Sequence, residues 1–124
     1  MYQVVEIVGP AEPWWFFEGW QNDITRKRLF STLEEALDFY EIEFTKLQQT
    51  FEKSSYRANF MSAFYDEGDI LACDACGQEE QRYHGLALLQ DWKGIDAREA
   101  RQHLKTHSLL EQLSRQWVAS QTEN

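Results

Sequence analysis

The stretch from Leu33 to Phe51 constrains the fold of this chain more than any other part of the sequence. Its apolar residues recur every three or four positions, which is the spacing of one helical face. We therefore predict a helix from about Thr32 to Lys53, whose apolar stripe packs on a sheet. The stripe consists of Leu33, Ala36, Leu37, Tyr40, Phe44, Leu47 and Phe51.

The same segment carries its own start signal and an acidic outer surface. Either Ser31 with Glu34 or Thr32 with Glu35 can form a capping box at the helix start. Carboxylates near a helix N-terminus also suit the helix dipole. The front half of the predicted helix contains Glu34, Glu35, Asp38, Glu41 and Glu43.

Runs of β-prone residues on either side of the helix supply the predicted sheet. Residues 2–8 form a first strand that ends at a Gly-Pro pair, and residues 59–65 and 83–90 form further strands. The short apolar run 70–72 is predicted to pair with 59–65 as a hairpin across a turn at 66–69.

Capping signals recur near the C-terminus. Asp96 with Glu99 and Ser108 with Glu111 predict two short helices with a break near Ser108. No linker, repeat or low-complexity tract interrupts the sequence, so residues 1–124 are predicted to form a single domain. The expected fold is α+β, with an antiparallel sheet, one long amphipathic helix packed on it and a C-terminal helical segment.

The charge balance limits the partners that the chain can bind. Its net charge of −9 at pH 7 repels a phosphate backbone or an anionic membrane on average. No apolar run is long enough to cross a bilayer, and the opening residues lack a signal-peptide pattern. We therefore expect a cytoplasmic protein whose two cysteines are not joined in a disulfide.

The motif CDACG, which begins at Cys73, carries the most specific chemistry. Cys73 and Cys76 can share one tetrahedral zinc ion, and the glycine lets the backbone turn beneath it. His103 and His107, four residues apart on a predicted helix, are the expected remaining ligands of a closed structural zinc knuckle. His84 is a rival ligand. The competing interpretation places His103 and His107 in a last helical turn without metal.

Catalytic uses of these cysteines lack the companion residues that they need. A deaminase has a proline before the first cysteine, where this chain has Ala72, and a His-x-Glu that is missing here. A zinc protease needs a glutamate after its first histidine, and His103 is followed by Leu104. A thioredoxin-like site keeps a proline near its thiols, and no proline follows Pro13. We therefore expect that the chain is not an enzyme. A Cys-x-x-Cys redox or zinc enzyme is the minor alternative.

The string WWFFEGW, over residues 14–20, concentrates aromatic side chains. As an extended strand it would place rings on both faces, and burial on both sides is the preferred interpretation. The functional interpretation is a surface for a protein partner made by Trp14, Trp15 and Trp20, because Trp is common at interface hot spots.

Arg26, Lys27 and Arg28 precede an apolar pair and are expected to open a short strand. Three adjacent cations can contact phosphates, but an isolated triplet in an acidic protein is more typical of a solvated strand edge. Nucleic acid binding through this triplet is therefore an alternative to the expected function.

Two strings resemble a known family: EPWWFFEGW, from Glu12 to Trp20, and YHGL, from Tyr83 to Leu86. They are similar to small acidic cytoplasmic proteins of Gram-positive bacteria, catalogued as domain of unknown function 1033, over most of the chain. The resemblance implies no established activity and no catalytic residues. Some members are labelled as DNA-binding or competence-associated, which implies a nucleic-acid-associated accessory role as the alternative.

Together these features predict a small cytoplasmic protein-binding or regulatory module stabilised by a structural zinc. Its expected contact surface combines Trp14, Trp15 and Trp20 with the acidic face of the first helix.

Overall fold

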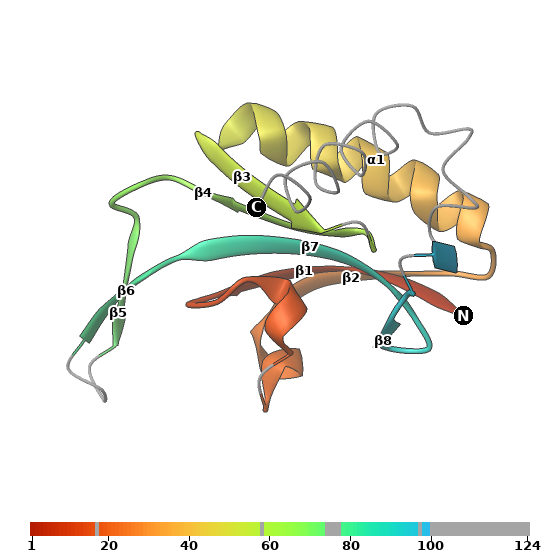
Figure 1. Ribbon diagram of the computed structural model, residues 1–124, viewed down its shortest axis with the longest axis horizontal. Coiled ribbons are helices and arrows are strands. Elements are labelled where there is room, and N and C mark those ends of the chain that lie inside the picture. Colours follow the sequence, from red (N-terminus) through yellow and green to blue (C-terminus); the bar gives the residue numbers. More distant parts are fainter. Residues whose placement is uncertain (17, 58, 74–77, 97, 100–124) are drawn as a thin grey trace.

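The computed structural model describes residues 1–16, 18–57, 59–73, 78–96 and 98–99. One long helix lies across one face of the main sheet, and two short 3-10 turns lie on the opposite face (Figure 1). In chain order the elements are β1 (Tyr2–Gly9), η1 (Pro13–Trp15), η2 (Trp20–Asp23), β2 (Ile24–Phe30), α1 (Leu33–Thr50), β3 (Lys53–Arg57), β4 (Met61–Tyr65), β5 (Ile70–Cys73), β6 (Gln78–Gln81), β7 (Tyr83–Gln90) and β8 (Lys93–Gly94).

The main sheet is antiparallel and has the strand order β2-β1-β7-β4-β3, with β8 paired to β7. Its centre is the long pairing of β1 with β7, which runs from Tyr2 opposite Gln90 to Gly9 opposite Tyr83. A separate two-stranded sheet, β5-β6, extends beyond one end of the main sheet (Figure 1). The predicted α+β class, with an antiparallel sheet and one long helix packed on it, is confirmed.

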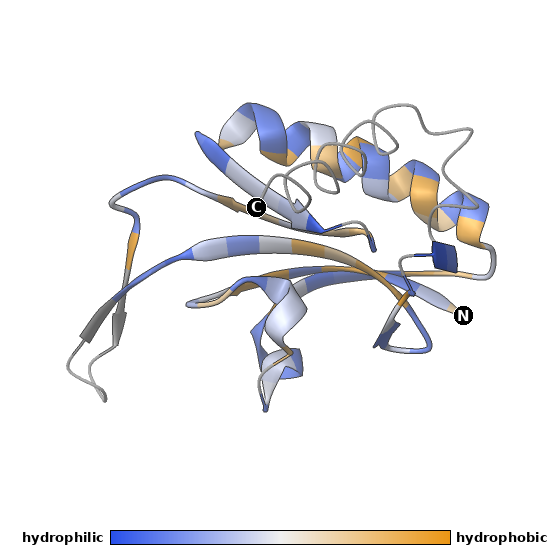
Figure 2. Cartoon of the chain, in the orientation of Figure 1, coloured by the Kyte–Doolittle hydropathy of each residue, from blue (hydrophilic) through white to orange (hydrophobic). Residues whose placement is uncertain are grey.

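The long helix begins as predicted. Thr32 is its N-cap, and the Thr32 side chain accepts a hydrogen bond of 3.3 Å from the backbone N–H of Glu35. The helix ends at Thr50 because Lys53 already belongs to β3. Its apolar side faces the sheet and its polar side faces outward (Figure 2). The buried residues of α1 are Ala36, Leu37, Tyr40, Glu43 and Phe44.

Alternate residues of the strands build a core on each face of the sheet. The helix-facing core combines the apolar residues of α1 with Val4, Phe64, Leu86 and Leu88. Within it the hydroxyl groups of Tyr40 and Ser62 share a hydrogen bond of 2.7 Å, so the buried phenol is satisfied. The opposite core contains Val5, Ile7, Met61, Ala87 and Leu89, packed against Trp14, Phe16, Trp20 and Ile24.

The predicted strand over residues 14–20 is wrong, because the backbone turns twice there. Pro13 opens η1, and Phe16 ends it with a left-handed φ of 47°. Gly19 then takes a φ of 80° before η2. Gly85 lets this segment lie close over β7, because a Cβ at residue 85 would lie 3.1 Å from the Pro13 ring.

The predicted hairpin between residues 59–65 and 70–72 is also wrong. β4 pairs with β3 and β7, whereas β5 pairs with β6. The chain leaves the main sheet at the turn closed by the Asp69 N–H and the Asp66 carbonyl, 3.1 Å apart. The Gln81 side chain fixes this exit by donating hydrogen bonds to the carbonyls of Asp66, Asp69 and Arg82.

Sequence reasoning missed β3. Ser54 and Ser55 give this stretch little apolar character, but β3 is an edge strand and needs little of it where it faces solvent. The predicted helices after Asp96 fall largely outside the described residues, apart from the first cap, where Asp96 accepts from the N–H of Arg98 and Glu99. In the described part of the chain, no helix is long and apolar enough to cross a membrane.

Candidate functional site

Strand β2 is an edge of the main sheet. Among the described residues it pairs with β1 alone, and residues Thr25 to Leu29 are all exposed. In an antiparallel pair, every second residue directs its N–H and C=O away from the neighbouring strand. β2 therefore presents a row of backbone donors and acceptors that another strand can use.

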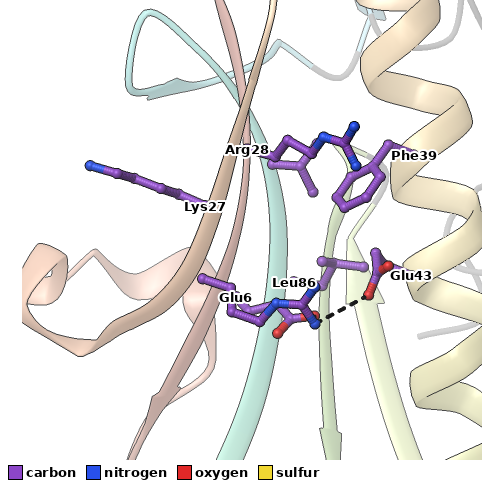
Figure 3. A pocket seen from close by; sticks show the side chains of 8 residues that line it. Glu6, Lys27, Arg28, Phe39, Glu43 and Leu86 are labelled. Carbon is purple, nitrogen blue, oxygen red and sulfur yellow. Dashed lines mark ion pairs between the residues drawn. The ribbon is translucent and has the colours of Figure 1, made fainter.

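The basic triplet on β2 is divided between the two faces of the sheet. Arg28 points toward Phe39 on α1, whereas Lys27 points away from the helix (Figure 3). Arg26 shares the helix-facing side with Arg28, as its contacts with Glu6 and Glu43 require. The three charges therefore do not form one continuous basic patch.

Arg26 is neutralised by one buried and one partly buried carboxylate. Its guanidinium lies 3.7 Å from Glu6 Oε1 and 3.9 Å from Glu43 Oε2. The Lys46 ammonium approaches Glu43 Oε1 at 3.3 Å. Glu43 is only 4% exposed, and these two cations compensate the cost of burying its charge. Arg26 thus serves the fold and offers little positive charge to a partner.

Arg28 and Lys27 have a different environment. The Arg28 guanidinium stacks 4.9 Å from the Phe39 ring centroid and 5.7 Å from that of Phe30. Lys27 Nζ lies 5.9 Å from the Trp92 ring on the other face. Within the described ranges neither cation has a carboxylate in ion-pair distance. Aromatic stacking orients both while leaving their N–H donors available.

A recess lies on each side of β2. The smaller, between β2 and α1, has a volume of about 80 Å³, and the residues that line it include Glu6, Arg26, Arg28, Phe39 and Glu43 (Figure 3). The broader one has a volume of about 410 Å³ and is lined by Gln21, Ile24, Thr25, Arg26, Lys27 and Trp92. An added strand would thus find room for side chains on both faces.

A buried glutamine positions Trp92. The side-chain amide oxygen of Gln3 accepts a 2.8 Å hydrogen bond from the backbone N–H of Trp92. The side-chain amide nitrogen of Gln3 donates a hydrogen bond to the Met1 carbonyl. Asp91 and Trp92 take left-handed φ values of 52° and 65°, which suit a tight hairpin turn. The turn therefore holds the half-exposed Trp92 ring beside Lys27.

The Glu6 carboxyl group makes this site sensitive to pH. Burial raises its pKa, Arg26 lowers it, and Glu43 raises it again through like charge and a shared hydrogen bond. The folded protein therefore holds the Glu6 proton at pH values where the unfolded chain has released it. This contribution to stability is complete below the ordinary pKa of 4.5 and is lost as pH rises through the folded pKa.

We expect Glu6→Gln to gain stability relative to the wild type as pH rises from about 4 to about 7.5, because glutamine resembles the protonated acid and avoids its ionisation. Urea unfolding of both proteins across this range measures the difference. Glu52→Gln, at an exposed position, is the matched control. A difference for Glu6→Gln that does not vary with pH would contradict the expectation.

The model of a family described as protein of unknown function (DUF1033) matches residues 1–116. The chain belongs to the DUF1033 family. Neither a curated protein nor a solved structure matches it.

The aromatic segment of this DUF1033 protein is divided between core and surface. Trp14 and Trp20 are partly buried against the sheet, and the Arg57 guanidinium lies 4.4 Å from the Trp14 ring. Trp15 is 56% exposed, and its Nε1 donates a 2.8 Å hydrogen bond to Glu12. The three tryptophans are therefore not one open aromatic surface.

The predicted metal ligands lie mostly outside the described residues, which exclude Cys76, His103 and His107. Cys73 ends β5 directly opposite Gln78, which begins β6. His84 lies in β7, and its ring centroid is 4.4 Å from that of Phe51. Its Nε2 atom is 4.0 Å from the Asp69 carboxylate. Burial lowers the pKa of His84, which favours the neutral ring, although Asp69 opposes this shift. Among described side chains, no group of three or more potential ligands could hold a metal ion.

Sequence reasoning identified the basic triplet of the DUF1033 protein but missed Phe39, Glu43 and Trp92. Phe39 lies beside the helical stripe rather than in it, and Glu43 looks like one more solvent-facing acid. One signal was available. The apolar stripe of a surface helix is broad, so an aromatic residue next to it, such as Phe39, can still pack against the core.

Proposed function

We propose that this chain is a small protein-binding module that pairs its edge strand β2 with an extended, acidic segment of a partner protein. The observation that carries the proposal is the presence of two stacked cations without carboxylate partners in the described structure, on an exposed edge strand. Backbone hydrogen bonds along such an edge provide affinity, and the flanking recesses provide side-chain selectivity.

The opposite edge of the sheet fits this role less well. On β3, Lys53 is 3.6 Å from the Glu67 carboxylate, and Arg57 stacks on Trp14. Lys53 on that edge is therefore already paired with a carboxylate, whereas neither Lys27 nor Arg28 has a carboxylate partner among the described residues. This difference supports β2 as the docking strand.

The charge of β2 also disfavours a second copy of the chain as its partner. Two β2 strands paired edge to edge would bring arginine and lysine side chains of both copies together, and like charges placed opposite each other destabilise a sheet. A partner segment that carries carboxylates would instead be attracted to the cations of β2. The same side chains that oppose self-association thus favour an acidic strand.

The net charge of −9 is compatible with such a partner. At physiological salt the Debye length is about 8 Å, so distant carboxylates are largely screened while cations at the contact are not. A short segment with two negative charges meets little long-range repulsion. Nucleic acid, with one charge about every 1.7 Å of duplex, meets far more.

Pairing of backbones can be tested with N-methylated peptides. The probe is a blocked, β-branched, nine-residue peptide with two central glutamates, prepared with N-methyl groups on the even or on the odd residues. We expect the unmodified peptide and one isomer to shift the β2 backbone amide resonances of the full chain, while the other isomer fails because its methyl groups face the strand.

Equal binding of both isomers would overturn strand pairing, because binding would then depend on side chains alone. Concentration-dependent dimerisation that is abolished by the peptide would overturn the choice of an acidic partner in favour of a second copy. The nucleic-acid alternative predicts a salt-sensitive gel shift that disappears in Arg26→Glu/Arg28→Glu. If nucleic acid binds in this way and competes with the peptide, the nucleic-acid role would replace this proposal.

A structural zinc at Cys73 and Cys76, completed by His103 and His107, is proposed as a separate stabilising feature of the module. It is supported by the register of the small sheet, because Cys73, the first cysteine of the motif, ends β5 directly opposite Gln78 at the start of β6.

A further inference from the structure

We propose that the partner segment carries two adjacent carboxylates, one for Arg28 and one for Lys27, next to an apolar residue that meets Leu29. This inference rests on the proposed strand pairing and specifies the sequence of the segment that β2 selects. It follows from the alternation of side chains along an edge strand and from which of its cations are already neutralised.

Successive residues of an added strand face opposite sides of the sheet, as those of β2 do. The partner residue beside Arg28 therefore lies on the helix side, and the neighbouring residue, beside Lys27, lies on the opposite side. Because Arg28 and Lys27 are consecutive and point in opposite directions (Figure 3), their acidic partners are consecutive as well. Two acids separated by one residue would share a single face.

On the helix side, the next cation along β2 is Arg26, which would not bind a second acidic residue of the partner. A partner residue two positions from the one at Arg28 would lie beside Arg26, whose guanidinium is already within 4 Å of both Glu6 and Glu43. A third carboxylate there would lie close to the carboxylates of Glu6 and Glu43 and would be repelled by them. The partner residue at this position is therefore neutral.

Arg28 suits a carboxylate in particular. Its guanidinium lies against both the Phe30 and the Phe39 ring, so little side-chain freedom is lost when its N–H groups form a bidentate pair with a planar carboxylate. Lys27, over Trp92, provides a single charge at the mouth of the broader recess. Leu29 is 52% exposed and points to the same side as Lys27, which accounts for the apolar partner residue.

The order along an antiparallel partner is thus apolar, acidic, acidic, neutral. The test compares two blocked peptides of identical composition, TVTLEETVT with adjacent acids and TVTELETVT with separated acids. We expect the adjacent peptide to bind the full chain at least about ten-fold more tightly, because only it forms both charge-assisted contacts. Titration followed by β2 amide shifts measures both affinities.

Variants connect this preference to the two cations. The double variant Lys27→Gln/Arg28→Gln is expected to lower the affinity for the adjacent-acid peptide to that for the separated-acid peptide. The matched control is Lys93→Gln, which removes an exposed cation on β8 and is expected to leave the preference intact. An unchanged far-ultraviolet circular dichroism spectrum verifies that the double variant is folded.

The possible failures are distinguishable. If both peptides bind β2 with equal affinity, the adjacent-acid inference is overturned and strand pairing stands. If neither peptide shifts the β2 amides, the proposed function fails and the inference falls with it. If Lys93→Gln abolishes the preference as the double variant does, the selectivity reflects overall charge and not Lys27 and Arg28.

Discussion

Phe64→Ala is expected to lower the free energy of unfolding by about 3–5 kcal/mol, a large part of the roughly 5–15 kcal/mol that stabilises a typical domain. Phe64 lies in β4, is fully buried and makes an edge-to-face contact with Phe44 of α1, with ring centroids 5.2 Å apart. Truncation removes this contact and leaves a cavity that the surrounding strands cannot fill. Urea unfolding of the full chain measures the loss.

Two further variants separate cavity formation from a general effect of mutation. Phe64→Leu retains part of the volume and is expected to cost less than Phe64→Ala. Ile42→Ala removes a side chain that is 54% exposed on α1 and is expected to stay within about 0.5 kcal/mol of the wild type. Equal losses for Phe64→Ala and Ile42→Ala would show that the helix-facing core does not carry the stability assigned to it.

The second large effect concerns the proposed zinc. Protein purified without added metal or a metal-affinity step is expected to contain about one zinc per chain, and Cys73→Ser to lose it. A structural zinc contributes on the order of 10 kcal/mol to the folding of the segment that it closes. Elemental analysis gives the metal content, and amide hydrogen exchange locates the loss of protection.

The structure indicates which amides should lose hydrogen-exchange protection when zinc is removed. Cys73 belongs to the β5-β6 sheet, which is separate from the main sheet. We therefore expect metal removal to deprotect the hairpin while the β1-β7 pairing persists. His84→Asn discriminates between the ligand sets, because it retains zinc if His103 and His107 are ligands. Metal-free protein with unchanged hydrogen exchange would end the zinc proposal.

The elements that sequence reasoning placed well are those encoded over short stretches. α1 follows from the repeating apolar stripe, and its start follows from Thr32, whose cap involves a residue three positions away. β1 and β7 follow from continuous runs of β-prone residues. In each case the deciding contacts lie within one element or at its ends.

The errors concern contacts between residues far apart in the chain. The run 70–72 has the apolar character of a hairpin partner for β4, but β7 and β3 occupy both sides of β4. The string at residues 14–20 has strand-like composition, but two left-handed residues turn it back over the sheet. Neither outcome could be predicted from local composition, because competition for the edges of β4 is settled by the whole sheet.

The candidate site shows the same division. The sequence by itself determined that three cations lie side by side on a short strand, that a long acidic helix packs on a sheet, and that the chain resembles its family. Only the tertiary structure decided that Arg26 is neutralised while Lys27 and Arg28 are not. The reason is physical: the effective charge of a side chain depends on the distances to Glu6, Glu43, Phe39 and Trp92, and folding alone brings these residues to β2.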